Sequence, residues 1–326
     1  MAAIPQAAAD GGVASAGGGV GVAATEPRQR GSLGWTEAGL AAMVFIWGLN
    51  FAVAKRALET LDPLAFNALR YTIASGFVFV VLRWQGRLAM PARSDWARIL
   101  ILGIFGNTLY QLAFIVGLDL TTAGSASLML AVMPVFVLAL EMWSGSRHGA
   151  RAWVGAAASI MGVGLVSRAA LSLEGSTALL GNLLMICAAA FWALYTQGSR
   201  PLIRRYGAVR TTAYTLWAGA AGIFVMGIPS LLRQSWGDVD TVSWAGLLYS
   251  AFLSIGLAYL LWYRGVARLG GSRTAIYSNL TPVVALAAGA LWLGEDLTLL
   301  SVVGAALVIG GVMLVREQKR GAGARS

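Results

Sequence analysis

Three polar side chains share one face of an apolar segment. Asn107, Tyr110 and Gln111 stand at positions i, i+3 and i+4 of the run 97–117, so a helix would present them on one side. Two amides and a phenol can hydrogen-bond the polar end of a small molecule, whereas lipid offers them no partner. We therefore expect this face to line a binding site. The alternative is that these groups only join neighbouring helices.

A tryptophan followed three positions later by a polar residue occurs twice. Trp47 precedes Asn50 in "FIWGLNFAVAK", and Trp192 precedes Tyr195 in "AAFWALYTQGSR". An amide facing lipid would be penalised, so Asn50 should point into the protein, either lining a cavity or bonding a neighbouring helix. We expect Trp47, Asn50 and Tyr195 to belong to the walls of one cavity, with simple packing as the alternative for Trp47.

The second half of the chain holds a related aromatic stripe. Tyr259, Trp262 and Tyr263 have the same spacing within the run 243–263, and Tyr259 aligns with Gln111 when positions are counted from the glycines that follow. Aromatic stripes at helical spacing usually pack in cores. Because two related stripes stand at matching places in the two halves, we expect them to line a cavity, with rings enclosing an apolar group of a substrate.

Two prolines interrupt apolar runs at matching places. Pro134 and Pro282 each remove a backbone donor and strain the preceding turn, so we expect a helix kink at both. Tyr277 and Asn279 stand directly before Pro282. The loosened carbonyl groups there either bind substrate together with these side chains or are satisfied by neighbouring hydroxyls.

One cation lies inside an apolar run. Arg70 stands about two turns into the run 64–82, where a charge must reach the surface, pair or face water. It serves either to draw a substrate carboxylate or phosphate to a cavity mouth, or to pair with an outer acid such as Asp62 or Asp119. Snorkelling to the outer surface is a further alternative.

Glu141 is the one carboxylate well inside an apolar run, near the end of 122–143 that we expect to be cytoplasmic. Such a group is a candidate for proton coupling. A boundary carboxylate paired with Arg147 or Arg151 is the alternative. Since no acid lies near the middle of a run, facilitated diffusion stays open beside proton-coupled transport.

The composition makes lipid the expected solvent. Of 326 residues, 58% are hydrophobic and 12% charged, against about 25% charged residues in soluble domains. We predict an all-α integral membrane protein with ten transmembrane helices, from about ten apolar runs near 36–54, 64–82, 97–117, 122–143, 152–167, 178–197, 210–231, 243–263, 273–293 and 298–315.

The basic residues predict the orientation. With a cytoplasmic N-terminus, 19 lysines and arginines lie in inner segments and 4 in outer segments, as the positive-inside rule demands. We expect a multi-pass protein of a bacterial inner (plasma) membrane with both termini in the cytoplasm. This distribution explains the net charge of +10, so the bilayer, rather than nucleic acid, is the expected partner.

The chain also resembles itself. Residues 143–166 align with 292–315, and 122–136 with 271–285. Each half has five runs, an odd number, so the second copy should lie inverted, with a binding site between the halves. The expected organisation is a disordered cytoplasmic tail 1–34, five-helix repeats 35–168 and 177–316, and a basic cytoplasmic tail 317–326.

Small residues four positions apart mark the fifth and tenth runs. They are Ala158 with Gly162, and Ala306 with Gly310. Faces of this kind let helices approach closely. We expect them to pack helices together or to form a dimer surface, rather than to contact substrate.

Four stretches carry a family resemblance: "WGLNFAVAK", "LDPLAFNALRYTIAS", "GLDLTTAGSASLMLAVMPVFVLAL" and "NLTPVVALAAGALWLGEDLT". Their order and repetition resemble the drug/metabolite transporter superfamily, of the ten-helix EamA type, over about residues 36–316. The resemblance implies transport of small metabolites, often amino acids, usually outward. The glutamate of "LGE", Glu295, is Ser146 in the first half, so we assign Glu295 no transport role and expect an acidic helix cap.

Together these features predict an exporter of small metabolites such as amino acids, including aromatic ones, working by alternating access. A multidrug or other small-molecule exporter of the same fold is the alternative. A membrane-embedded enzyme acting on a lipid-linked substrate is disfavoured, because the single histidine and single cysteine have no catalytic partner in the sequence. We expect no cofactor and no metal, and a monomer and a homodimer stay open.

Overall fold

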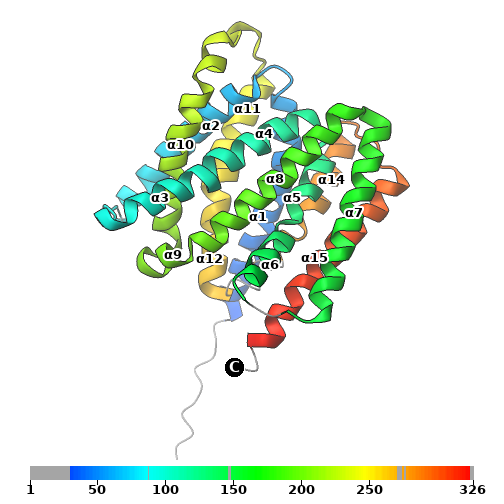
Figure 1. Cartoon of the computed structure of the whole chain (residues 1–326). Helices are drawn as coiled ribbons and strands as arrows, with labels where there is room; N and C mark the ends of the chain where they lie inside the picture. The colour runs from blue at the N-terminus through cyan, green and yellow to red at the C-terminus, as the bar shows by residue number, and fades with distance from the viewer. Residues whose placement is uncertain (1–29, 87, 146–147, 270–273, 275–276, 324–326) are drawn as a thin grey trace, which may run out of the picture.

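The computed structural model describes residues 30–86, 88–145, 148–269, 274 and 277–323. Every regular element in these ranges is helical, and the helices form one bundle (Figure 1). Residues 1–29 and 324–326 of the two expected tails lie outside the described residues, as does Ser146. Within the described part, the first helix begins at Arg30 and the last helix ends at Gly323. Helical structure therefore extends into both expected tails.

The two halves have matching orders of helices. The first half contains α1 (Arg30–Ala57), α2 (Pro63–Trp84), η1 (Arg93–Asp95), α3 (Trp96–Gly103), η2 (Ile104–Leu109), α4 (Tyr110–Leu120), α5 (Ala123–Ala131), α6 (Met133–Trp143) and α7 (Ala150–Glu174). The second contains α8 (Ser176–Gly198), α9 (Arg200–Tyr206), α10 (Ala208–Arg233), η3 (Trp236–Asp238), α11 (Thr241–Leu248), η4 (Tyr249–Leu257), α12 (Ala258–Leu269), α14 (Thr281–Trp292) and α15 (Leu299–Gly323).

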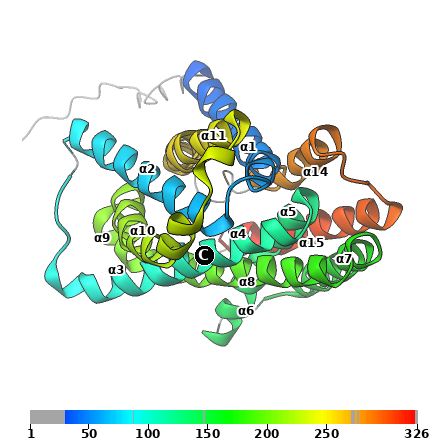
Figure 2. The same cartoon turned by 90° about the horizontal axis from the view of Figure 1, so that it is seen from above.

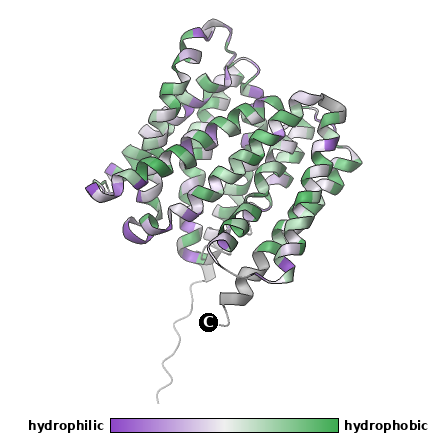
Figure 3. Cartoon of the chain, in the orientation of Figure 1, coloured by the Kyte–Doolittle hydropathy of each residue, from purple (hydrophilic) through white to green (hydrophobic). Residues whose placement is uncertain are grey.

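Eight helical stretches of the described chain are long and apolar enough to cross a membrane, and α14 (Thr281–Trp292) and the apolar part of α15, Leu299–Val315, are two shorter apolar helices. Hydrophobic residues occupy most of the length of the helices, while hydrophilic residues lie mostly near the helix ends (Figure 3). Large apolar side chains such as Trp84 and Trp143 are exposed, as expected where lipid is the solvent. Of the ten expected spans, eight are thus present as candidates in the described chain, and the ninth and tenth runs give the two shorter apolar helices.

The prolines divide two of the predicted runs. Pro134 lies in the first turn of α6, directly after α5 ends, and Pro282 lies in the first turn of α14. A proline is tolerated at this position because the first N–H groups of a helix have no intrahelical acceptor.

The fifth and tenth runs pack against each other. Figures 1 and 2 show α7 and α15 side by side at one edge of the bundle. A Cβ added at Gly162 would lie 2.5 Å from the carbonyl oxygen of Gly304, so only glycine permits this approach. The face that α15 uses contains Gly304 and Gly311, whereas Ala306 and Gly310 are exposed. The expectation that Ala306 and Gly310 pack helices together is therefore wrong, since the contact with α7 turns that side outward, and the dimer surface stays a prediction.

Two π-helical segments were not predicted. η2 lies in the third run of the first half and η4 in the third run of the second half. Such segments are rare and frequently occur at functional sites, because the extra residue rotates the following side chains relative to a regular helix. Here η2 contains Asn107 and ends directly before Tyr110, and η4 ends shortly before Tyr259.

Candidate substrate site

One group of aromatic side chains joins the two halves of the chain. Tyr110 and Phe114 of α4 have ring centroids 6.0 Å apart, and Tyr110 lies 4.9 Å from Trp192 of α8. Trp192 lies in turn 5.1 Å from Tyr195. We call Tyr110, Phe114, Trp192 and Tyr195 the first aromatic cluster. The side chains of Asn107, Tyr110 and Gln111, for which a shared face is expected, are all buried.

Helix α10 of the second half also contacts this region. The hydroxyl groups of Tyr195 and Thr215 lie 3.1 Å apart, and the amide nitrogen of Asn107 donates to the Thr215 carbonyl oxygen at 3.1 Å. A Cβ added at Gly106 would collide with the Tyr195 ring. Asn107 therefore ties η2 to α10, which is the helix-joining alternative for that amide.

A second aromatic cluster consists of Trp47 from the first half and Tyr259 and Trp262 from the second. Trp47 of α1 lies 5.8 Å from Tyr259 and 5.7 Å from Trp262, both of α12. Tyr277 packs against the same group of apolar residues. In each cluster a tryptophan from the first long helix of one half meets aromatic or polar positions from the third run of the other half.

Asn50 and Asn279 are both buried. The amide oxygen of Asn50 accepts a hydrogen bond from the hydroxyl of Ser250 at 2.7 Å. Asn50 thus joins α1 to η4, as the interior-facing expectation requires. Asn279 stands two residues before α14, next to the turn at Pro282.

Arg70 is 1% exposed and lies among neutral groups. Its Nη2 donates to the amide oxygens of Asn67 at 2.8 Å and Gln111 at 2.6 Å. The snorkelling alternative is wrong, because the side chain is buried. The pairing with Asp62 is wrong too, because Asp62 accepts from the backbone N–H groups at the start of α2. Asp119 forms no ion pair with Arg70, since none of the ion pairs among the described residues involves this arginine.

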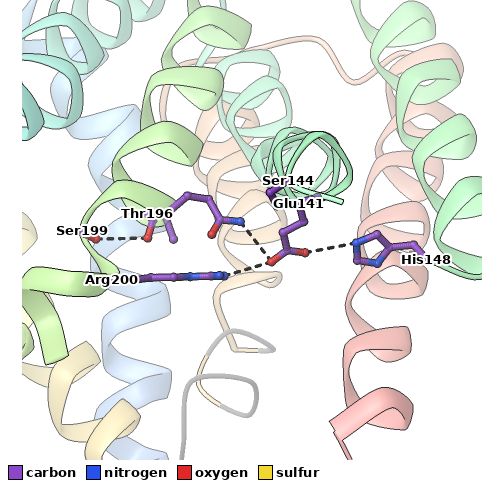
Figure 4. Close-up of polar contacts among 7 residues, drawn as sticks. Glu141, Ser144, His148, Thr196, Ser199 and Arg200 are labelled. Atoms are coloured by element: carbon purple, nitrogen blue, oxygen red, sulfur yellow. Dashed lines mark hydrogen bonds and ion pairs between the residues drawn. The ribbon is translucent and has the colours of Figure 1, made fainter. Parts of the chain in front are cut away.

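Glu141 of α6 lies at the centre of a polar network that does not include Arg70 (Figure 4). Its Oε1 accepts from Arg200 at 3.1 Å and from the amide of Gln197 at 3.2 Å, and its Oε2 lies 3.7 Å from Nε2 of His148. Of the two alternatives Arg147 and Arg151, Arg147 lies outside the described residues. The pairing with Arg151 is wrong, since the cation that binds Glu141 among the described residues is Arg200, at the start of α9. Glu141 thereby links the two halves.

Glu295 binds the opening of α5. Its carboxylate oxygens accept from the backbone N–H groups of Ala123 at 2.5 Å and Gly124 at 3.0 Å. A carboxylate at a helix N-terminus satisfies donors that have no intrahelical acceptor and complements the helix dipole. Burial raises the pKa of Glu295, while these hydrogen bonds and Lys55 oppose that shift. Only a glycine at position 289 leaves room for the carboxylate.

Sequence reasoning missed several partners of the candidate residues. Asn67 lies one helical turn before Arg70, so a search for polar residues at i−3 would have found it. Thr215 and Ser250 each lie four positions from another buried hydroxyl residue, Thr211 and Ser254 respectively, and this spacing is the signal that would have found them. Among the described residues, no group of three or more histidine, cysteine, aspartate or glutamate side chains could hold a metal ion.

Two copies of the pattern that defines the EamA-like transporter family match this chain, at residues 34–168 and 179–316. The chain belongs to the EamA-like transporter family. It is therefore a multi-pass membrane transporter with two EamA repeats, and not an enzyme.

Relatives of this EamA-like transporter include proteins named for export. It is 30% identical over 282 residues, 83% of its length, to a "Probable amino-acid metabolite efflux pump" of Salmonella typhimurium, of which 91% is covered. It is 27% identical over 283 residues, 86% of its length, to a "Probable terminal-alkyne amino-acid exporter" of Streptantibioticus cattleyicolor, of which 93% is covered. A protein of known crystal structure matches 86% of the transporter and 97% of its own chain, with a TM-score of 0.59 and 20% identity, which shows the fold alone.

Proposed function

We propose that this transporter exports small metabolites such as amino acids, including aromatic ones, across a bacterial inner membrane. The observation that carries the proposal is the contact between Tyr110 of the first half and Trp192 of the second. A substrate bound among these rings touches both halves at once. Movement of one half against the other then changes the access to that substrate.

The chemistry of the candidate residues fits such a cargo. Rings of the two aromatic clusters can enclose an apolar side chain, and a buried amide such as Asn279 can bind a polar end. The names of the relatives from Salmonella typhimurium and Streptantibioticus cattleyicolor both refer to amino acids. We infer the same class of cargo for this chain.

The topology belongs to the same proposal. Ten membrane-crossing segments, arranged as two inverted repeats around a central cavity, bring both termini to the cytoplasm. The excess of arginine and lysine in the segments assigned to the inner side supports this orientation. Glu141 binds Arg200 at the expected cytoplasmic end, so the inner ends of the two halves are joined by an ion pair.

Flux measurements test the proposal. Purified protein in liposomes is offered labelled amino acids and small organic cations, with and without a pH gradient. We expect saturable flux of amino acids, reduced about threefold to tenfold by Tyr110→Leu, because one aromatic contact is lost. Trp143→Leu is the matched control, since that ring is 90% exposed.

Each outcome has a distinct meaning. Amino-acid flux that equilibrates without a gradient identifies a facilitator, and accumulation only with a gradient identifies coupling. Flux of the organic cations alone would replace the proposal with multidrug export. If no solute crosses faster than in protein-free liposomes, the proposed function is wrong.

A further inference from the structure

Arg70 is the largest fully buried side chain in the described part of the protein. It lies on α2 and reaches Gln111 on α4. Phe66, Tyr71 and Phe114 surround its guanidinium, with Cζ between 5.2 and 5.8 Å from the ring centroids. A full positive charge is therefore held in an aromatic environment within an apolar helix bundle.

The hydrogen-bond donors of Arg70 are only partly used. A guanidinium carries five N–H groups. Nη2 makes the two bonds to Asn67 and Gln111, whereas Nε is buried and has no acceptor among the described residues. Buried polar groups in native proteins are almost always hydrogen-bonded, so an unsatisfied Nε–H group requires an explanation.

The charge of Arg70 is also uncompensated. Both of its acceptors are neutral amides, and no carboxylate lies within 4 Å in the described ranges. Contacts with ring faces offset only part of the cost of removing a cation from water. An anion at the free Nε edge would supply both the missing acceptor and the missing charge.

The first aromatic cluster begins beside this cation. Phe114, which borders the guanidinium, also contacts Tyr110, and Tyr110 contacts Trp192. A small molecule with an anionic end at Arg70 would therefore lay its apolar part along these rings. A single buried cation balances a single negative charge, which favours a carboxylate over a doubly charged phosphate.

We propose that Arg70 binds the carboxylate group of the transported substrate through its unused Nε–H group. This inference rests on the proposed function and deepens it. The substrate class is then a monocarboxylate with an apolar or aromatic body, such as a zwitterionic amino acid, and not an amine without a carboxylate. Gln111 and Asn67 are positioning residues that hold the guanidinium in place.

Matched pairs of solutes test the inference on the intact protein. L-phenylalanine and L-leucine are compared with L-phenylalaninamide and L-leucinamide, which keep the side chain and the amine but lack the carboxylate. Competition with labelled substrate in liposomes measures all four. We expect each amide to compete about 10- to 100-fold more weakly than its amino acid, the range for a hydrogen bond to a charged group.

Substitution of the arginine provides the second measurement. In Arg70→Gln the ratio between amino acid and amide should fall towards one, and Arg70→Lys should restore part of it. Arg83→Gln is the matched control, because Arg83 lies on the same helix and is exposed. Size-exclusion and thermal unfolding profiles show whether the variants fold. If Arg70→Gln does not fold, the competition between amino acids and amides on the wild-type protein tests the inference.

The outcomes separate this inference from the proposed function. If wild-type protein transports amino acids but the amides compete equally well, the inference is overturned and the proposed function stands. A variant that folds, transports and still prefers the amino acids overturns it too. If neither amino acids nor amides are transported or compete, both are overturned.

Discussion

The indole nitrogen of Trp47 donates a hydrogen bond to the backbone carbonyl oxygen of Ser254, 3.0 Å away. This bond joins α1 of the first half to the π-helix η4 of the second. Two more bonds join the same elements: Tyr249 donates to the carbonyl oxygen of Ile46 at 3.0 Å, and Ser250 donates to Asn50. Three hydrogen bonds thus join α1 of the first half to the irregular segment η4 of the second.

Trp47→Phe keeps an aromatic ring but removes the bond to Ser254. We expect the free energy of unfolding to fall by about 1 kcal/mol, because one buried carbonyl loses its side-chain donor. Thermal unfolding in detergent measures the change. Trp143→Phe, at a ring that is 90% exposed, should change little. Equal effects of the two substitutions would contradict the role assigned to this bond.

Asn50 and Ser250 should be energetically coupled. A double-mutant cycle with Asn50→Ala and Ser250→Ala measures their interaction free energy, and about 0.5 to 2 kcal/mol is expected for a hydrogen bond between membrane helices. The same four proteins are tested for transport. Additive effects on stability would show that the bond contributes nothing, and a transport loss in Asn50→Ala alone would assign this amide to substrate binding.

Glu141→Gln removes a charge but keeps an oxygen that can accept from Arg200. Because Glu141 already binds the guanidinium of Arg200 and the amide of Gln197, we expect it to link helices rather than to carry protons. The rate of substrate flux should change in Glu141→Gln, while the dependence of that flux on a pH gradient should not. Flux with and without the gradient measures both, with exposed Glu37→Gln as the control. Loss of gradient-driven accumulation in Glu141→Gln would make this residue the coupling acid.

Glu295→Ala should destabilise the protein by about 1 kcal/mol, the usual effect of losing a helix N-terminal cap. The reason is that the N–H groups of Ala123 and Gly124 lose their acceptors. Asp296→Ala is the matched control, since its exposed carboxylate is the next residue. Chemical unfolding of both variants measures the difference, and equal stability of the two would refute the cap.

Asp240 predicts a stability change in acid. The Ser243 backbone N–H and then the Arg56 guanidinium, 2.7 and 2.8 Å away, lower the pKa of Asp240 from 3.8 to about 2. A carboxyl group with a lowered pKa contributes stability that is complete above its unfolded value and is lost as the pH falls through its folded value. We therefore expect the wild-type unfolding temperature to approach that of Asp240→Ala as the pH falls from about 4 towards 2.

The control for this pH series is Asp238→Ala, which removes an exposed carboxylate nearby. Its difference from wild type should not follow the same pH window. A constant difference between wild type and Asp240→Ala down to about pH 2 would contradict the assignment.

The sequence by itself determined the features that depend on one segment at a time. Length and hydropathy decide whether a run can form a helix in lipid, and helical periodicity decides which residues share a face. The inward direction of Tyr110 and Gln111 and the repeated places of Trp47 and Trp192 could therefore be predicted.

Only the tertiary structure decided which distant groups meet. Arg70 binds Gln111 rather than Asp62 or Asp119, and Glu141 binds Arg200, 59 residues later in the chain. A helical pattern shows a direction but not the neighbour that lies there, because the neighbour depends on crossing angles and on where small residues allow close approach. The π-helices rotate the following residues out of the regular pattern as well, so the partners of these polar side chains follow from packing and not from spacing.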